Sequence, residues 1–523
     1  MVPPMRSGCA CCSFTRRQVL AAGCTACVGA AGVLTTPSRA RAAQDNSKVR
    51  VRIIYSLHAP RQPRPDWPNI GFDFQPHMER IAAELRQRCP NIEFVTSTAK
   101  GPEEAAKILE QDKSAAIDGY LVYQMNCWNR VVQTIAESGK PTLYADFQYG
   151  GSGGFLVYTA GFLRSQTANV GYVASSRIED LAAAARCFEM VKRGANPAEF
   201  ATAVARIRKE RTPAPGDLKG KPDQLSSLSP SECLARMKES RILAIAKGRD
   251  GLGEAIHREM GIDVRDVPFE ELNAAWEAAD KDEARAIVDR WQKSAAKIAD
   301  VSRETLEQSA AMYLAEKALL KKYGANAITI NCLGGFYGKH IQAYPCLGFH
   351  ELLNEGLIGA CEADTRSTAT MVAMTTLTQG RPGFISDPVI DTSQRQIIYA
   401  HCVASNRAFG PKGQTNPFQI LTHSEDRQGA SVRSLLPLGY MTTTVEFGPD
   451  RKVILFHQGK AVANVDDDRA CRTKLAAEPV GDIEKLFREW DQWGWHRVTY
   501  YGDLKEPVFA LADAMGWKVL EEA

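Results

Sequence analysis

Short apolar runs alternate with helix-like segments from residue 49 to residue 145, and this alternation constrains the fold more than any other feature. Strand-like runs occupy residues 49–55, 92–95, 117–123 and 141–145. Helix-like segments lie between them at residues 78–88, 105–111 and 128–138. Repeated β-α units of this length place their strands in parallel and put helices over the sheet. The pattern therefore predicts a doubly wound parallel sheet.

The rest of the chain divides into two further regions. Residues 208–230 are rich in proline and serine and poor in large apolar residues, and a second β-α pattern begins at residue 241. From residue 359 onward, apolar residues alternate as they do in antiparallel strands. We predict an α/β protein with two doubly wound parallel-sheet domains followed by a β-rich α+β C-terminal domain. The expected ranges are 43–185, 186–234 (a linker or excursion), 235–358 and 359–523.

The first 42 residues have the features of an export signal. They carry five arginines and no acidic residue, and Arg16-Arg17 precede a short apolar run that ends at Ala40-Arg41-Ala42. This pattern is typical of a cleaved twin-arginine signal, with a retained anchor as the alternative. This segment also contains five cysteines. We interpret them as small residues of a discarded peptide, in preference to ligands of a metal cluster. We therefore expect a periplasmic or exported protein that folds in the cytoplasm, where metal is accessible.

Charge and cysteine usage exclude several classes of protein. Removing the signal lowers the formal net charge of +3 by five arginines, so the remaining chain is nearly neutral. No basic patch indicates nucleic acid, and no later apolar run is long enough for a membrane span. Nine of the 14 cysteines remain, without paired short spacings, so a disulfide framework is not expected.

Two glycine-rich segments follow predicted strands. Residues 150–154 have the sequence Gly-Gly-Ser-Gly-Gly and lack the spacing of a phosphate loop. They form either a flexible turn or a substrate-facing loop. Residues 332–338 precede Lys339 and His340. Open α/β sheets bind ligands at the carboxyl ends of their strands. We therefore expect Lys339 and His340 to lie beside the substrate.

Two carboxylates and two imidazoles in the last third of the chain form a candidate metal site. They are Glu362, Asp387, His401 and His496. Oxygen and neutral nitrogen ligands together suit a labile divalent ion such as Mn²⁺, and a carboxylate beside the ion can move protons. Each residue taken alone has a simpler explanation: a helix cap (Glu362 or Asp364), a turn before proline, a core histidine and a packed surface ring.

The order of these residues resembles the L-fucose and L-arabinose isomerase superfamily. In the arabinose branch a Gly-Glu-Gly-Asp-type motif, a Phe-x-Glu/Asp segment, a strand-borne histidine and a Gly-x-His-His element hold Mn²⁺. These features correspond to Glu362, Asp387, His401 and His496 in this chain. Asp387 stands where the arabinose enzymes have glutamate, and the last element has one histidine here. The resemblance extends to residues 123–126, which end a strand of the first sheet.

The resemblance implies a metal-dependent aldose–ketose isomerase. Glu362 and Asp387 would bind Mn²⁺ or another divalent ion and act as base and acid on a cis-enediol, while His401 and His496 would complete the metal site. Gln124 and Asn126 would contact the sugar. A homotrimer or homohexamer with active sites shared between subunits is also implied.

Two alternatives stay open at this point. Two α/β lobes and an export signal also describe a periplasmic sugar-binding protein without catalysis. The same fold and metal could instead serve another enolisation, or a lyase reaction, on a modified sugar. A pair of acid/base carboxylates beside a metal favours an enzyme over a binding protein.

Overall fold

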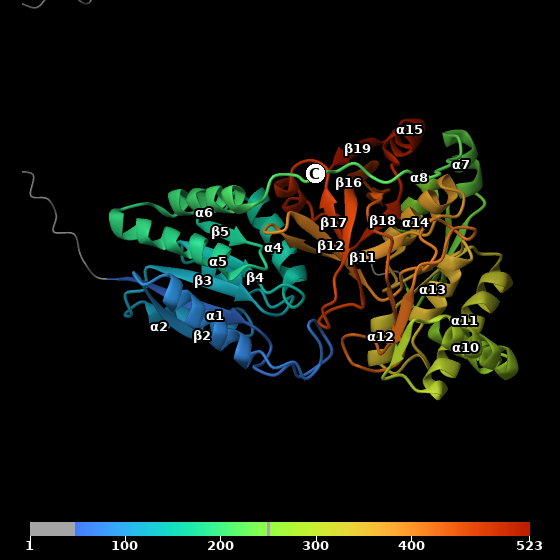
Figure 1. Cartoon of the computed structure of the whole chain (residues 1–523), viewed down its shortest axis with the longest axis horizontal. Coiled ribbons are helices and arrows are strands. Elements are labelled where there is room, and N and C mark those ends of the chain that lie inside the picture. The colour runs from blue at the N-terminus through green and yellow to red at the C-terminus, as the bar shows by residue number, and fades with distance from the viewer. Residues whose placement is uncertain (1–47, 248–250) are drawn as a thin grey trace, which may run out of the picture. The chain divides into compact units, whose positions relative to one another are not determined.

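The computed structural model describes residues 48–247 and 251–523 (Figure 1). The predicted twin-arginine signal lies outside the described residues. Within the described ranges, no helix has the length and apolarity needed to cross a bilayer. The helices and strands that follow all belong to the unit Lys48–Ala523.

A five-stranded parallel sheet, in the order β2-β1-β3-β4-β5, begins this unit. Its strands are β1 (Val49–Ser56), β2 (Ile92–Ala99), β3 (Gly119–Gln124), β4 (Thr142–Asp146) and β5 (Val170–Val173). Its helices are α1 (Gln75–Arg88), α2 (Pro102–Asp112), α3 (Val131–Ala136), α4 (Ser152–Arg164), α5 (Ile178–Ala185), η1 (Arg186–Arg193) and α6 (Pro197–Arg211). Ile53 and Leu121 enter one apolar core with α1 and α5, whereas Ile54 and Val122 enter another with α2, α3 and α4. Helices cover both faces, which confirms the α/β arrangement.

A second parallel sheet has four strands in the order β10-β9-β6-β7. They are β6 (Arg241–Ile245), β7 (Asp263–Val267), β9 (Ala327–Ile330) and β10 (Ile358–Ala360). The helices of this region are α7 (Pro230–Met237), α8 (Gly253–Met260), α9 (Phe269–Glu277), α10 (Lys281–Ser294), α11 (Arg303–Tyr323), α12 (Cys332–Tyr337), α13 (Cys346–Asn354) and α14 (Thr365–Leu377). Residues 212–229, inside the expected linker, contain no helix or strand. This stretch contacts the C-terminal part of the chain, where the Lys221 amide donates to the Gly439 carbonyl at 2.8 Å.

The last part is β-rich, as expected, and its sheet closes on itself. The strand order is β15-β18-β11-β12-β17-β16-β19, and β15 also pairs with β16. The strands are β11 (Phe384–Asp391), β12 (Gln396–His401), β15 (Met441–Gly448), β16 (Val453–Asn464), β17 (Thr473–Pro479), β18 (Arg497–Tyr501) and β19 (Lys518–Glu521). Around this closed sheet lie α15 (Lys505–Met515), η2 (Ile483–Phe487) and a three-stranded sheet of β8 (Lys297–Ala299), β13 (Phe418–Leu421) and β14 (Ser431–Ser434).

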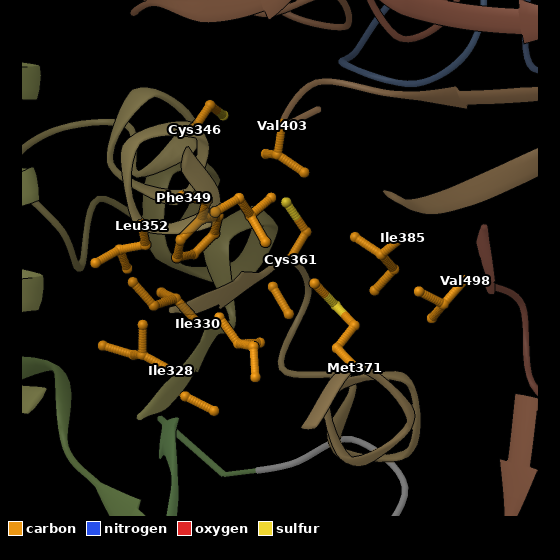
Figure 2. Packing of buried hydrophobic residues seen from close by; sticks show 14 of the residues in the cluster. Ile328, Ile330, Cys346, Phe349, Leu352, Cys361, Met371, Ile385, Val403 and Val498 are labelled. Atoms are coloured by element: carbon orange, nitrogen blue, oxygen red, sulfur yellow. The ribbon is translucent and has the colours of Figure 1, made fainter. Parts of the chain in front are cut away.

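The second sheet and the closed sheet share one apolar core. Figure 2 shows Ile328 of β9, Phe349 of α13 and Met371 of α14 in the same cluster as Ile385 of β11 and Val498 of β18. These side chains are buried. Burying an aliphatic or aromatic side chain of this size contributes roughly 1.5–3 kcal/mol each. The shared core therefore fixes the end of β10 against β11 and β18.

Candidate metal centre and cavity

The turn from β10 into α14 presents Glu362. Glu362 and Ala363 both have left-handed backbone angles, with φ of 64° and 50°. Non-glycine residues rarely adopt this conformation, and it is retained at sites where the surroundings demand it. The Ala363 amide donates to the Ile330 carbonyl at 2.9 Å, which ties the turn to β9. Asp364 then caps α14, accepting from the Ser367 amide at 2.9 Å. The cap is therefore Asp364, and Glu362 is left for the site.

Three adjacent strands bring Asp387, His401 and His496 together. β11 pairs with both β12 and β18, with Asp387 opposite Ala400 and Ser386 opposite Arg497. His401 follows Ala400 at the end of β12, and His496 precedes the first residue of β18. These antiparallel registers place the three side chains at one end of the closed sheet. Glu362 reaches the same place from the β10–α14 turn.

The ligand atoms of Glu362, His401 and His496 lie within 4.8 Å of one another. Nε2 of His401 is 4.0 Å and Nε2 of His496 is 3.9 Å from Oε1 of Glu362. Asp387 joins them, with Oδ1 at 3.3 Å from Nε2 of His496. The structure thus brings all four predicted ligands together.

Three of these inward-facing atoms have no hydrogen-bond partner. Asp387 Oδ1, His401 Nε2 and His496 Nε2 are buried and unsatisfied among the residues that the structure describes. Each such atom costs roughly 1–3 kcal/mol unless something pairs with it. Carboxylate oxygens and imidazole nitrogens converging on one point form the donor set of a divalent cation. The residues present therefore fit a metal ion.

Asp364 orients one of the ligands, a role that the sequence did not reveal. Nδ1 of His496 donates to Oδ2 of Asp364 at 2.8 Å. Such a bond from a carboxylate holds the ring and directs Nε2 to the metal position. Burial opposes a charge on His496, but its hydrogen bond to Asp364 and the nearby negative charges of Asp387 and Glu362 outweigh burial and raise its pKa well above the usual value. The cluster of negative charge therefore attracts a cation, either a proton on His496 or a metal ion.

A cavity of about 810 Å³ is lined by Glu362, Asp387 and His496. Its wall includes Trp67 and Trp128 from the first sheet's loops, Tyr337 from α12, and Trp495 next to His496. Trp128 is 53% exposed, and its ring meets the Trp495 ring edge-on at 5.4 Å. Aromatic rings beside polar groups are typical of small-molecule sites.

The cavity wall carries charges of both signs. Besides the metal-site carboxylates it includes Asp66, Glu425, Arg64 and Arg366. Asp66 lies 3.0 Å from His58, and Arg366 lies 3.2 Å from Asp450. Arg64 is exposed, and no ion pair or hydrogen bond engages its side chain within the described part of the chain.

The predicted sugar contacts on the first sheet are buried beneath this cavity. Gln124 accepts from the Tyr144 hydroxyl at 2.8 Å and donates to the Asn126 carbonyl at 2.5 Å. Asn126 donates to the Trp67 carbonyl at 2.8 Å and accepts from the His58 amide at 3.0 Å. Both side chains are fully buried. Asn126 holds the loop that carries Trp67, and a direct sugar contact of either residue stays a prediction.

The other predicted contacts, Lys339 and His340, come just after the part of α12 that lines the cavity. The His340 ring stacks on Phe269 at 5.7 Å. The cavity-lining residues of this segment are Leu333 and Tyr337. Contact of Lys339 or His340 with a substrate also stays a prediction.

The glycine-rich segment 150–154 serves close packing. A Cβ on Gly151 would lie 1.9 Å from the Gln124 carbonyl oxygen, and one on Gly153 would lie 2.5 Å from the Trp495 ring. The residues from Ser152 onward form the start of α4. The glycines let this helix press against the end of β3 and the loop that carries His496, so the segment is a packing surface, not a flexible turn.

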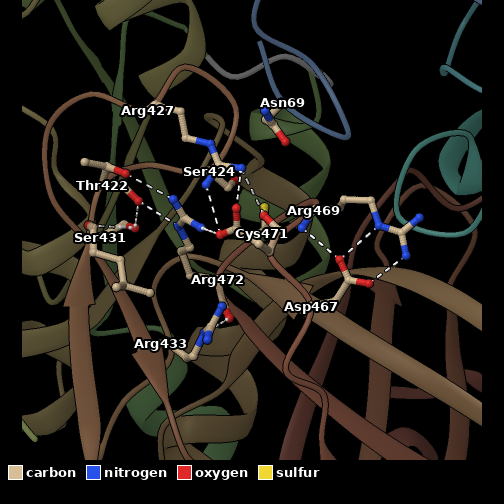
Figure 3. Close-up of polar contacts among 12 residues, drawn as sticks. Asn69, Thr422, Ser424, Arg427, Ser431, Arg433, Asp467, Arg469, Cys471 and Arg472 are labelled. Atoms are coloured by element: carbon tan, nitrogen blue, oxygen red, sulfur yellow. Dashed lines mark hydrogen bonds and ion pairs between the residues drawn. The ribbon is translucent and has the colours of Figure 1, made fainter. Parts of the chain in front are cut away.

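The loop of residues 422–428 completes the wall and is held by arginines. Figure 3 shows Arg472 donating to Thr422, with Nε 2.8 Å from the backbone oxygen and Nη2 3.0 Å from Oγ1. Arg427 pairs with Asp468 at 2.8 Å. These contacts fix both ends of the loop that presents Glu425.

Comparison with known proteins finds relatives over part of the chain. No model of a known protein family matches it. Sulfoquinovose isomerase from Clostridium sp. (strain MSTE9) is 28% identical over 213 residues, which cover 39% of this chain and 46% of the relative. Sulfoquinovose isomerases from Alkalicoccus urumqiensis and Priestia aryabhattai are 22% and 24% identical over 30% and 36% of this chain, and 35% and 42% of theirs. The chain thus spans less than half the length of these curated relatives.

Solved structures give only weak likenesses. A periplasmic solute binding protein from Actinobacillus succinogenes 130z with bound D-allose aligns with 64% of this chain and 92% of its own, at 10% identity and a TM-score of 0.16. Francisella novicida lysine decarboxylase aligns with 44% of this chain and 41% of its own, at 9% identity and a TM-score of 0.17.

Proposed function

We propose that this protein is a metal-dependent aldose–ketose isomerase. The observation that carries the proposal is the convergence of Glu362, His401 and His496 with Asp387 beside His496, and three buried polar atoms of this group are unsatisfied within the described residues. The sugar isomerases among its partial relatives support the same class of reaction. A binding protein without catalysis would need neither two carboxylates nor a metal beside its sugar.

The reaction moves one proton between C1 and C2 and one between the two oxygens. Glu362 and Asp387 are the two carboxylates able to carry these protons through a cis-enediol, one as base and one as acid. A divalent ion held by the four residues would polarise the sugar oxygens as a Lewis acid. His496, oriented by Asp364, holds its Nε2 toward Asp387 and Glu362.

An aldose with an anionic substituent is supported by the exposed Arg64 in the cavity wall and by the substrate in the relatives' names. Mn²⁺ is the ion expected from the resemblance. Export by the twin-arginine pathway rests on Arg16-Arg17, and a homotrimer or homohexamer rests on the resemblance. Light scattering and cell fractionation test the last two.

The test of the function uses purified full-length protein loaded with Mn²⁺. L-fucose, L-arabinose and sulfoquinovose are each incubated in D₂O, and ketose formation and deuterium uptake at C2 are followed by NMR. We expect both signals for at least one sugar, and their loss in Glu362→Gln and Asp387→Asn. Sugar binding without exchange under any divalent metal would instead indicate a binding protein. Exchange followed by loss of water, or by carbon–carbon cleavage, would indicate the lyase alternative.

A further inference from the structure

An aldose in solution is mostly a closed ring, and an isomerase acts on the open aldehyde. Opening the ring breaks the C1–O5 bond, gives a proton to O5 and removes one from the O1 hydroxyl. O5 is bonded to C1, so a group that reaches O5 must share a cavity with the groups that reach C1 and C2. A further acid in the wall of the metal-site cavity would meet this requirement.

We propose that Glu425, positioned by Tyr337, is the acid that opens the sugar ring. This inference rests on the proposed isomerase function. In the step, the Glu425 carboxyl gives its proton to O5 as the C1–O5 bond breaks, and the O1 proton leaves to water. Water then returns a proton to Glu425, so the step needs no oxidant, reductant or other co-reactant.

The first support is the geometry of the pair. Glu425 and Tyr337 line the same cavity as Glu362 and Asp387. The Tyr337 hydroxyl donates to Oε2 of Glu425 at 2.6 Å. Oε1 has no partner among the described residues, so it is the oxygen available to a ligand. A phenol that donates to one oxygen of a carboxylic acid leaves the other free to carry and release the proton.

The second support is the contrast with the other carboxyls of the wall. Asp66 lies 3.0 Å from His58, and Asp364 lies 2.8 Å from His496. Asp387 and Glu362 lie 3.3 Å and 3.9 Å from His496. Within the described residues, Glu425 has no basic group within 4 Å, and a phenol is its only hydrogen-bond partner. An unpaired carboxyl in such a place favours the neutral acid.

The protonation of Glu425 agrees with this geometry. Burial in the wall is the largest influence, and the charges of Asp66 and Glu362 add to it. His423 and the Tyr337 bond act in the opposite direction but are weaker, so the pKa of Glu425 rises to about 8. The carboxyl therefore keeps its proton at neutral pH. Neighbouring Asp426 differs, because it pairs with His423 at 3.1 Å and its pKa is lowered.

The third support is that the backbone holds Glu425 in place. Its carbonyl accepts from the Ile70 amide at 2.7 Å, which joins the loop before α1 to the loop of residues 422–428. Arg472 binds Thr422 and Arg427 binds Asp468, so both ends of that loop are fixed; Figure 3 shows the two arginines. A side chain on such a support loses little conformational freedom when it meets a substrate, as precise acid catalysis requires.

The test separates ring opening from isomerisation. Exchange between the two anomers of L-fucose, L-arabinose and sulfoquinovose is measured by saturation-transfer NMR, with ketose formation followed in parallel. The variants are Glu425→Gln and Tyr337→Phe in full-length, Mn²⁺-loaded protein. The control is Glu271→Gln, which removes the acid of another tyrosine–glutamate pair, Tyr323–Glu271, outside the cavity. Mn²⁺ affinity and the melting temperature are recorded for every variant.

We expect the wild type to accelerate anomer exchange, and Glu425→Gln to slow it by about 100-fold or more, which is the usual contribution of a general acid. Tyr337→Phe should slow it less, and Glu271→Gln should leave it unchanged. Metal affinity and melting temperature should stay near the wild type. Anomer exchange within threefold of the wild type in Glu425→Gln would overturn the proposal. A loss of Mn²⁺ affinity in Glu425→Gln as large as its loss of anomer exchange would also overturn it. Accelerated anomer exchange without any ketose would reject the isomerase and keep the ring-opening acid.

Discussion

The closed sheet contains two buried polar clusters that differ in how their atoms are paired. In the first, Glu522 accepts from Arg497 at 2.9 Å and lies 3.0 Å from His457, whose other ring nitrogen meets the Tyr399 hydroxyl at 2.6 Å. These side chains are almost completely buried, and none of them has an unsatisfied atom. We call this group the Glu522 cluster.

The second cluster is the candidate metal centre, where Asp387, His401 and His496 each keep a buried atom without a partner among the described residues. Both clusters use the same kinds of side chain at similar depth. A paired buried network is a structural element, whereas unpaired atoms aimed at one point require something that is not protein. Completeness of pairing, more than residue type or burial, distinguishes the scaffold from the site.

The largest expected effect is on catalysis at the metal centre. Glu362→Gln and Asp387→Asn each remove a proton-carrying group and a metal ligand, so turnover should fall by at least about 1,000-fold. Ketose formation at saturating Mn²⁺ measures it. Glu522→Gln is the matched control, because it changes a carboxylate of the other cluster. An equal loss of activity in Glu522→Gln would show that catalysis does not depend specifically on the candidate metal centre.

The next effect is on stability. Here a change in the Glu522 cluster should have the larger effect, and a change in the candidate metal centre the smaller one. Glu522→Ala leaves Arg497 and His457 buried without their carboxylate, which should cost about 3–5 kcal/mol of unfolding free energy. Asp387→Asn in metal-free protein should change the stability by less than about 1 kcal/mol, because it removes one of several crowded negative charges. Urea unfolding measures both. Equal destabilisation by the two changes would contradict the comparison.

A smaller effect concerns the residue that orients His496. Asp364→Asn keeps the size of the side chain and removes its charge, so Mn²⁺ affinity should fall by about 10–100-fold. Isothermal titration calorimetry measures this loss. Asp426→Asn is the control. It makes the same change in a carboxylate that pairs with a different histidine, His423. An Asp364→Asn protein with wild-type affinity would show that Asp364 acts only as the cap of α14.

The sequence predicted those parts of the molecule that depend on local pattern. The apolar runs located the parallel sheets, and the residue types of the four ligands, with their order in the resemblance, indicated the candidate metal site. The Asp364–His496 contact spans 132 residues. It depends on the turn into α14 and on the register of β18, which no local pattern reports. The same holds for Glu425, whose place in the cavity wall depends on Ile70 and Arg472.

Gln124 and Asn126 illustrate a different limit. Their position at the end of a strand was correctly read, because the carboxyl ends of β3 and β4 do lie below the cavity loops. Which way an amide side chain turns depends on the partners that surround it in the folded chain. Here Tyr144, Trp67 and His58 supply those partners inside the protein. Polar residues at a strand end thus indicate the neighbourhood of a site before they indicate its contacts.

The smallest expected effect is the pH dependence of metal binding, and it tests the cation preference of the metal centre directly. The pKa of His496 is raised, so its proton stabilises the metal-free fold below the ordinary histidine value, and that contribution is lost as pH rises through the raised pKa. A metal ion must displace this proton. Mn²⁺ affinity should therefore rise by up to about tenfold per pH unit as the pH increases toward the raised pKa of His496, and it should level off above that pKa. Asp364→Asn weakens the partner that raises this pKa, so its plateau should begin at lower pH. A pH-independent affinity in the wild type would mean that His496 is not a ligand. The His496 side chain would then have a structural role, like the paired side chains of the Glu522 cluster.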